Sequence, residues 1–209
     1  MSNNIKLVSI PPVPKYLIDH ILDIPLDSYR VTDYHINSIV KSKNDYGWFQ
    51  DKSPVAQRYF YPSKDGYLHK EIRALVSQIS DNCDIKIAIQ RFSNTSTSSS
   101  LFPHIDAKNR KAAFNFYIDC GGTETKNIFY NLKDEHLDKK IPMPPFHYTY
   151  DWFNIIEECT LKPNNWYLLK SDVPHGVENI TSDRITIGID FLEDFNYFLS
   201  NHSNILGDL

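Results

Sequence analysis

The sequence predicts a mainly β fold with accessory helices, an α+β architecture. Short runs rich in β-branched and aromatic residues, separated by turn residues, fill much of the second half of the chain, and such runs are typical of strands. Apolar residues at helical spacing are concentrated in the first half, near residues 17–22 and 67–80. Because a chain of 209 residues can bury a substantial core, we expect one domain, 1–209.

Two helices are expected in the N-terminal part. The first has an apolar stripe followed by a proline as a stop signal: Leu17, Ile18, Ile21, Leu22 and then Pro25. The second spans residues 67–80, where the apolar positions at helical spacing are Leu68, Ile72, Leu75, Val76 and Ile79. We expect both helices to cover one face of the sheet, so residues 1–84 form an accessory part.

Two segments have more than one interpretation. The aromatic segment 46–61 either packs in the core or forms the wall of a substrate pocket. The segment 134–146 contains Pro142, Pro144 and Pro145 and predicts a long irregular loop, which is either a functional lid or a mobile linker.

A strand is expected over residues 112–118. Its side chains alternate, with Phe114, Phe116 and Ile118 on one face and Asn115 and Tyr117 on the other. The two polar side chains either line a pocket or point outward from a half-buried strand, because either face of such a strand can be the solvated one.

The C-terminal region predicts three short strands. These are residues 166–169, a strand starting at His175, and residues 184–191, with turns at 163–165, 171–174 and 181–183. In the last strand Arg184 and Thr186 share one face, while isoleucines occupy the other. A guanidinium beside a hydroxyl inside a barrel suits a carboxylate, which it can bind through two parallel hydrogen bonds. The alternative is an ordinary exposed arginine at a strand start.

Histidine followed two residues later by an acid occurs three times, so the pattern alone says little. The pairs are His69 with Glu71, His104 with Asp106, and His136 with Asp138. The first pair lies on the expected helix, where positions two apart point in different directions. The third lies in a run of mixed charge, residues 133–140, which predicts a solvated loop.

His104 and Asp106 have a different setting, between the Ser/Thr-rich segment 93–100 and the strand at 112–118. If the triplet is extended, both side chains project from one face. The alternative is a loop histidine with an aspartate turn residue. Adding His175 gives two imidazoles and one carboxylate, the ligand set of non-haem Fe(II) oxygenases.

Together these residues resemble the Fe(II) and 2-oxoglutarate-dependent oxygenases. In that family a His-x-Asp pair is followed by a distal His and then by an Arg with Ser or Thr two residues on; His104, Asp106, His175, Arg184 and Thr186 match these positions. The resemblance covers residues 85–191. Within it, residues 85–92 resemble the strand that leads toward the first ligand, and the turn starting at Cys120 resembles the turn after the next strand.

The resemblance implies a double-stranded β-helix, or jelly roll, of the cupin-like kind, with the N-terminal helices packed on one sheet. Residues 85–191 would be the catalytic core and residues 192–209 a C-terminal tail. His104, Asp106 and His175 would bind Fe(II), Arg184 would pair with the distal carboxylate of 2-oxoglutarate, and Thr186 would support it. Asn115 and Tyr117 are further candidates for the cosubstrate pocket.

The reaction that the resemblance implies uses molecular oxygen and converts 2-oxoglutarate to succinate and CO2, coupled to oxidation of a substrate C–H bond. Related halogenases have a small residue where this chain has Asp106, so a hydroxylase is expected. The prime substrate would be a protein side chain or a small molecule. Related enzymes that demethylate nucleic acids carry a second arginine six residues after the first, and this chain has Asp190 there.

Composition fits a plain soluble enzyme. The formal net charge of −4 gives no broad basic surface, so nucleic-acid binding is not expected. Three cysteines, Cys83, Cys120 and Cys159, are too few and unpatterned for a disulfide framework or a zinc ribbon. We find no apolar run of membrane-spanning length and no signal-peptide pattern, so the expected location is the cytoplasm, without a membrane partner.

One alternative of a different class remains. A non-catalytic jelly-roll module, used for binding or structure, could retain the metal-site pattern without turnover. Binding and consumption of 2-oxoglutarate would separate the two.

Overall fold

The protein is seen in a computed structural model that describes residues 4–31, 56–79, 85–93, 99–106, 111–136, 150–191, 193–207 and 209. The α-helices in these ranges are α1 (Lys15–Leu22), α3 (Tyr67–Val76) and α4 (Phe195–Asn201). The strands are β1 (Ile5–Val8), β2 (Arg30–Val31), β3 (Ala56–Phe60), β4 (Lys86–Ser93), β5 (Ser99–His104), β6 (Ala112–Cys120), β7 (Lys126–Leu132), β8 (Phe153–Cys159), β9 (Asn165–Lys170), β10 (His175–Ile180), β11 (Arg184–Asp190) and β12 (Leu206–Gly207). The described fold is therefore mostly β.

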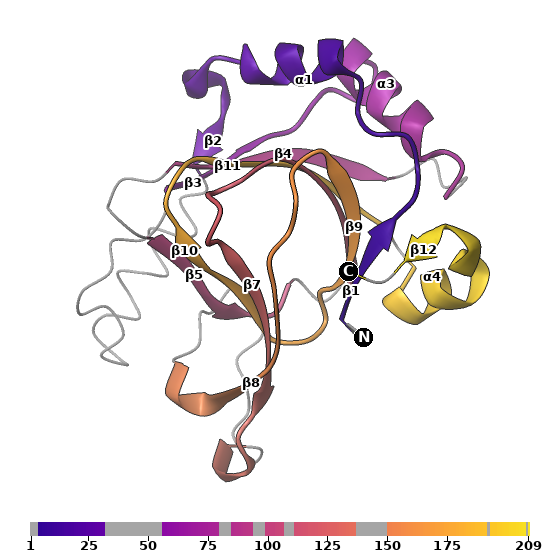
Figure 1. Ribbon diagram of the computed structural model, residues 1–209. Helices are drawn as coiled ribbons and strands as arrows, with labels where there is room; N and C mark the ends of the chain where they lie inside the picture. Colours follow the sequence, from indigo (N-terminus) through magenta and orange to yellow (C-terminus); the bar gives the residue numbers. More distant parts are fainter. Residues whose placement is uncertain are drawn as a thin grey trace.

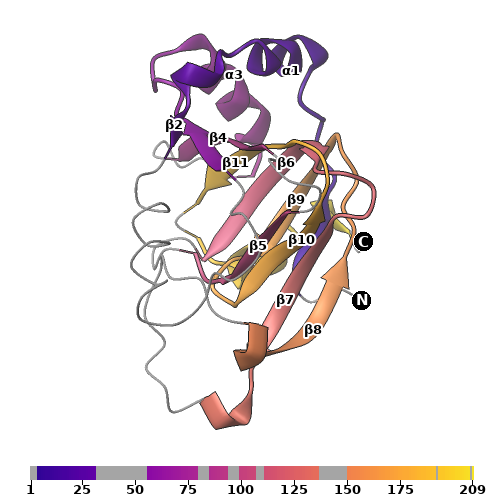
Figure 2. The same ribbon diagram turned by 90° about the vertical axis from the view of Figure 1, so that its left-hand side faces the viewer.

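The strands form two antiparallel sheets that face each other around a common interior (Figures 1 and 2). The larger sheet has the order β12-β1-β9-β6-β11-β4-β3-β2, and the smaller has the order β5-β10-β7-β8. The chain crosses repeatedly between them, so β4, β6, β9 and β11 lie in the larger sheet and β5, β7, β8 and β10 in the smaller.

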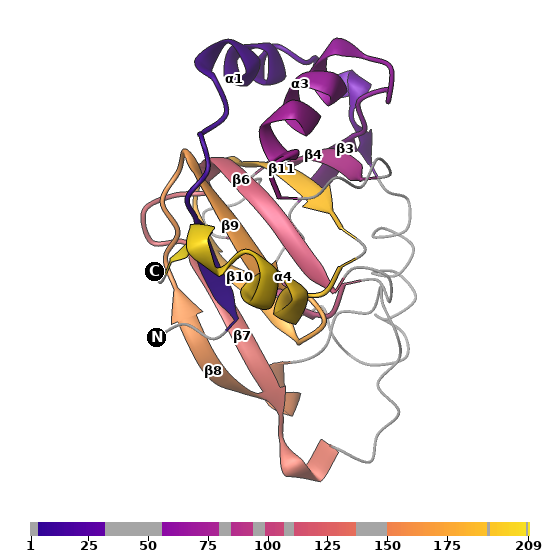
Figure 3. The same ribbon diagram turned by 90° about the vertical axis from the view of Figure 1, so that its right-hand side faces the viewer.

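The outer face of the larger sheet is covered by helices (Figures 1 and 3). Helices α1 and α3 pack over β4 and β11, and α4 lies on the same sheet beside β9. The buried core here includes Ile72 of α3, Ile187 of β11 and Phe198 of α4. Burying one such side chain contributes roughly 1.5–3 kcal/mol. The predicted packing of the N-terminal helices on one sheet is what the structure shows.

The inner face of the larger sheet points toward the smaller sheet. A second core cluster fills part of this interior and includes Tyr117 of β6, Phe129 of β7 and Tyr167 of β9. A β-bulge in β6, opposite the step from Ile185 to Thr186, lets Tyr117 and Cys120 both face inward although they are three residues apart. The strand alternation thus gives β6 and β11 an apolar outer face, aromatic on β6 and aliphatic on β11, and a more polar inner face.

The expected strands and turns around the interior are present as β6, β9, β10 and β11. Asn164, in the predicted turn 163–165, has a φ of 60°, a left-handed conformation that asparagine tolerates better than most residues. The strand implied for residues 85–92 is β4, and the turn after Cys120 contains Gly121 and Gly122 at φ of 92° and 116°.

Several expectations need correction. Helix α3 ends at Val76 rather than near residue 80, and the expected loop 93–100 contains the end of β4 and the start of β5. The segment 192–209, expected as a tail, contributes α4 and β12, and Phe195 and Phe198 are buried in the outer core. Residues 46–55 and 137–146, which belong to the two segments with open interpretations, lie outside the described residues.

None of the helices that the structure describes has the length and apolar character needed to cross a membrane.

Candidate metal centre

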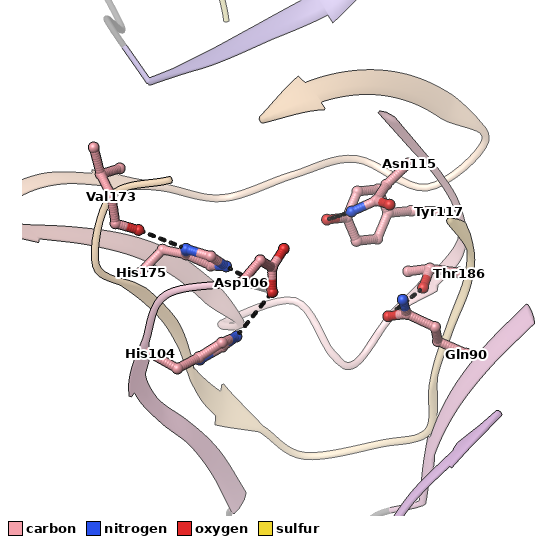
Figure 4. Close-up of polar contacts among 8 residues, drawn as sticks. All are labelled: Gln90, His104, Asp106, Asn115, Tyr117, Val173, His175 and Thr186. Atoms are coloured by element: carbon pink, nitrogen blue, oxygen red, sulfur yellow. Dashed lines mark hydrogen bonds and ion pairs between the residues drawn. The ribbon is translucent and has the colours of Figure 1, made fainter. Parts of the chain in front are cut away.

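His104, Asp106 and His175 lie together at one side of the interior (Figure 4). His104 Nε2 is 3.8 Å from Asp106 Oδ1, and His175 Nε2 is 3.9 Å from the same oxygen. One ligand atom from each residue lies within 4.8 Å of the other two. Among the described residues, these three side chains form a cluster of potential ligands that could hold a metal ion.

Strand pairing brings these residues together from distant parts of the sequence. His104 ends β5 and His175 begins β10, and the two residues are direct cross-strand partners in the smaller sheet. Their imidazole rings are 4.5 Å apart between centroids. Asp106 follows just beyond β5, where its backbone N–H donates to the carbonyl of Ser171 over 3.1 Å. The turn before β10 therefore holds the backbone of Asp106 beside the two histidines.

The orientation of the His175 ring is set by the backbone. His175 Nδ1 lies 2.8 Å from the carbonyl oxygen of Val173, and a carbonyl can only accept, so Nδ1 carries the proton. In the neutral ring this leaves the lone pair on Nε2, the nitrogen that faces Asp106. Phe129, the cross-strand neighbour on β7, packs beside the ring at 6.2 Å between centroids. A contact of this kind on the second ring nitrogen is typical of histidines that bind a metal.

The geometry fits one ion. Two ligand atoms that each bind a metal at about 2.1 Å lie no more than about 4.2 Å apart. Both separations from Asp106 Oδ1 satisfy this limit, and all three candidate ligand atoms lie within 4.8 Å of one another. Two imidazole nitrogens and one carboxylate on one side of an ion leave the opposite positions open, which is the arrangement of non-haem Fe(II) oxygenase sites.

Four polar side chains of the larger sheet lie across the interior from this group (Figure 4). Gln90 of β4, Thr186 of β11 and Tyr117 of β6 occupy neighbouring register positions, and Asn115 lies two residues from Tyr117. Thr186 Oγ1 donates to Gln90 Oε1 and Asn115 Nδ2 donates to the Tyr117 hydroxyl, both over 3.5 Å. Asn115 and Tyr117 therefore lie on the inner face of the sheet. The alternative interpretation, in which they point outward from a half-buried strand, is wrong.

Arg184 starts the same strand as Thr186 and is buried, with 4% of its surface exposed. Its guanidinium donates to Asn127 Oδ1 over 2.8 Å and to the Cys120 carbonyl over 3.4 Å, and it lies 4.8 Å from the centre of the Tyr117 ring. The exposed-arginine alternative is thus excluded. In the part of the chain that the structure describes, no carboxylate forms an ion pair with Arg184.

The titratable groups around Arg184 are held neutral. Burial raises the pKa of the Tyr117 hydroxyl, with only partial opposition from the Arg184 charge. Burial likewise raises the pKa of the Cys120 thiol to about 11 and that of the Cys159 thiol to about 12. Both cysteines are free, and at neutral pH neither is a thiolate nucleophile.

Two residues of this interior are missed by the sequence analysis, Gln90 and Asn127. Asn127 lies on β7, a strand that the sequence analysis did not identify, and only 4% of it is exposed. The run Ile128-Phe129-Tyr130, one β-branched and two aromatic residues, is a usable strand signal.

The histidines of the other two pairs, His69 and His136, lie elsewhere. His69 is buried on α3, and burial lowers its pKa. His136 was expected in a solvated loop, but it ends a short 3₁₀ helix, its side chain is 13% exposed, and its ring packs on Trp152 at 5.2 Å. The charge pattern of residues 133–140 gives no sign of this ring contact between His136 and Trp152.

Comparison with known proteins leaves the family open. No protein-family model matches the chain, and neither does any curated protein. Among solved structures, ycfD of E. coli aligns at 16% identity and a TM-score of 0.40, over 75% of this chain and 38% of that one. A prolyl hydroxylase from Trichoplax adhaerens, solved with a peptide fragment of the hypoxia inducible factor oxygen degradation domain, aligns at 9% identity and a TM-score of 0.40, over 84% and 88% of the two chains. Vicilin from Solanum melongena aligns at 10% identity and a TM-score of 0.36, over 70% and 31%. The chain thus spans well under half the length of the ycfD and vicilin chains.

Proposed function

We propose that this protein is a non-haem Fe(II) and 2-oxoglutarate-dependent oxygenase that hydroxylates a protein side chain or a small molecule. The observation that carries the proposal is the combination of His104, Asp106 and His175 with a buried arginine, Arg184, on the facing sheet. A metal site alone would suit several chemistries. A buried cation in the same interior adds a reason for a carboxylate-bearing cosubstrate.

The fold that we propose for the core is the double-stranded β-helix. Strands β4 to β11 divide evenly into two four-stranded sets, β9-β6-β11-β4 and β5-β10-β7-β8. Eight antiparallel strands in two facing sheets are the composition of a jelly roll. In this arrangement the ends of β5 and β10 place the two histidines side by side.

The metal ligands would be His104 Nε2, His175 Nε2 and a carboxylate oxygen of Asp106. Bound Fe(II), together with oxidative decarboxylation of 2-oxoglutarate, would supply the electrons that reduce molecular oxygen. The protein's own contribution is to orient the His175 ring through the Val173 carbonyl and to hold the Asp106 backbone through the Ser171 carbonyl.

The cosubstrate's distal carboxylate would bind Arg184, with Thr186 two residues nearer the middle of the strand as a second contact. Both residues are buried, with 4% and 2% of their surfaces exposed. Exclusion of water strengthens the attraction between a guanidinium and a carboxylate. Tyr117, which is also buried, would close one side of this pocket and offer a neutral hydroxyl.

The test is succinate release from 2-oxoglutarate by the purified protein with Fe(II), with and without candidate peptides and metabolites. We expect succinate to form in proportion to 2-oxoglutarate consumed, and to increase when a true substrate is present. A protein that binds metal and 2-oxoglutarate but never consumes the cosubstrate would contradict the proposal and favour a non-catalytic binding module.

A further inference from the structure

The buried guanidinium of Arg184 is paired only with neutral groups among the described residues. An arginine side chain keeps its charge at any physiological pH. Its hydrogen-bond acceptors, the Asn127 amide oxygen and the Cys120 carbonyl, carry no formal charge. Since a buried charge without a counter-ion is costly, this position is suited to a bound anion.

The side-chain amide of Asn127 has a fixed orientation. A guanidinium has donors and no acceptor, so the contact of 2.8 Å from Arg184 Nη2 must be made by the amide oxygen. The Nδ2 group is then the half of the amide that does not bond to Arg184, although it shares the amide carbon with the bonded oxygen. It is buried and, within the described residues, has no hydrogen-bond partner. A buried amide donor in this state costs about 1–3 kcal/mol, so an acceptor is expected beside it.

These two observations describe one anion site with two kinds of donor. Arg184 supplies the charge, and Asn127 supplies an N–H donor immediately next to the guanidinium. A carboxylate has two oxygens and can accept from both residues at once. An aspartate at position 127 would have nearly the same shape, but it would neutralise Arg184 internally.

We propose that Asn127 is a specificity-determining residue of the cosubstrate pocket: its Nδ2 donates to the distal carboxylate bound by Arg184, and its neutrality keeps Arg184 available for that anion. This inference rests on the proposed function for the identity of the ligand, 2-oxoglutarate. The pairing of Asn127 with Arg184 is independent of it.

The informative variant is Asn127→Asp, which is nearly isosteric. Without any ligand, the new carboxylate pairs with Arg184, so the melting temperature should stay level or rise by about 2–4 °C. In the Mn²⁺-loaded protein, calorimetric titration should show 2-oxoglutarate binding weakened by at least about 30-fold. Binding of 2-oxobutyrate, which lacks the distal carboxylate, should be unchanged. The matched control, Asn131→Asp, makes the same change at an exposed position of the same strand and should leave both affinities unchanged.

The melting-temperature comparison and the binding titrations can each give a result that contradicts the proposal. If Asn127→Asp lowers the melting temperature by several degrees, the pairing with Arg184 is not the one inferred. Equal weakening of 2-oxoglutarate and 2-oxobutyrate would show that Asn127 has only a structural role. If the unaltered protein with metal binds no 2-oxoglutarate, the proposed function fails, and the ligand-free melting comparison still decides the pairing.

Discussion

His175→Ala should weaken divalent-metal binding by at least about 100-fold, because even residues that only orient a metal ligand typically contribute 10–100-fold. His175 also faces the shared Asp106 oxygen at 3.9 Å, so its loss opens one side of the site. The truncated side chain lies at a strand start and is half-buried, so the fold should survive. Equilibrium dialysis against Mn²⁺, followed by measurement of bound metal, checks the result.

The matched control for this substitution is His20→Ala, at an exposed position near the end of α1. It should leave metal occupancy unchanged. His69 would be a poorer control because it is buried within the helix packing. Equal metal occupancy in His175→Ala and the unaltered protein would overturn the ligand assignment.

Arg184→Met should raise the 2-oxoglutarate concentration needed for half-maximal succinate release by at least about 30-fold. The reason is that loss of one partner of a buried charge pair costs about 2–5 kcal/mol. Metal affinity should be nearly unaffected, because Arg184 is not among the ligand residues. Steady-state succinate assays and metal dialysis on the same preparations give both quantities.

Two further variants define the role of Arg184. Arg184→Lys should be intermediate, since the ammonium keeps the charge but loses the planar fork of donors. Arg73→Met, the same change on helix α3, should not alter half-saturation. Unchanged half-saturation in Arg184→Met would mean that the cosubstrate is anchored elsewhere.

The sequence predicted the candidate site better than the whole fold. His104, Asp106 and His175 could be selected because their chemistry is specific and because turn residues mark the strand starts around His175 and Arg184. Tertiary structure then placed the two histidines as cross-strand partners, a relation that depends on the register of β5 and β10. This register cannot be predicted from the local sequence of either strand.

The missed elements had weak or conflicting local signals. Strand β5 begins in a Ser/Thr-rich run and contains Pro103, features that indicate a loop. Helix α4 is only seven residues long, although Asp194 caps it by accepting from the Tyr197 N–H over 2.8 Å. An aspartate just before apolar residues at helical spacing was a usable signal for that helix.

Asn127 illustrates a different limit. An asparagine in a short polar-apolar run has no special meaning in the sequence. Its importance comes from the contact with Arg184, 57 residues away. Such a relation depends on how β7 and β11 face each other across the two sheets, which neither strand specifies alone.

The most direct measurement is a crystal structure of the protein with Mn²⁺ and 2-oxoglutarate, grown without oxygen. We expect one metal ion bound by His104, Asp106 and His175. We also expect 2-oxoglutarate between that ion and Arg184, with its distal carboxylate on the guanidinium and on Asn127 Nδ2. A metal bound at other residues, or a 2-oxoglutarate carboxylate that does not contact Arg184, would contradict the proposed function.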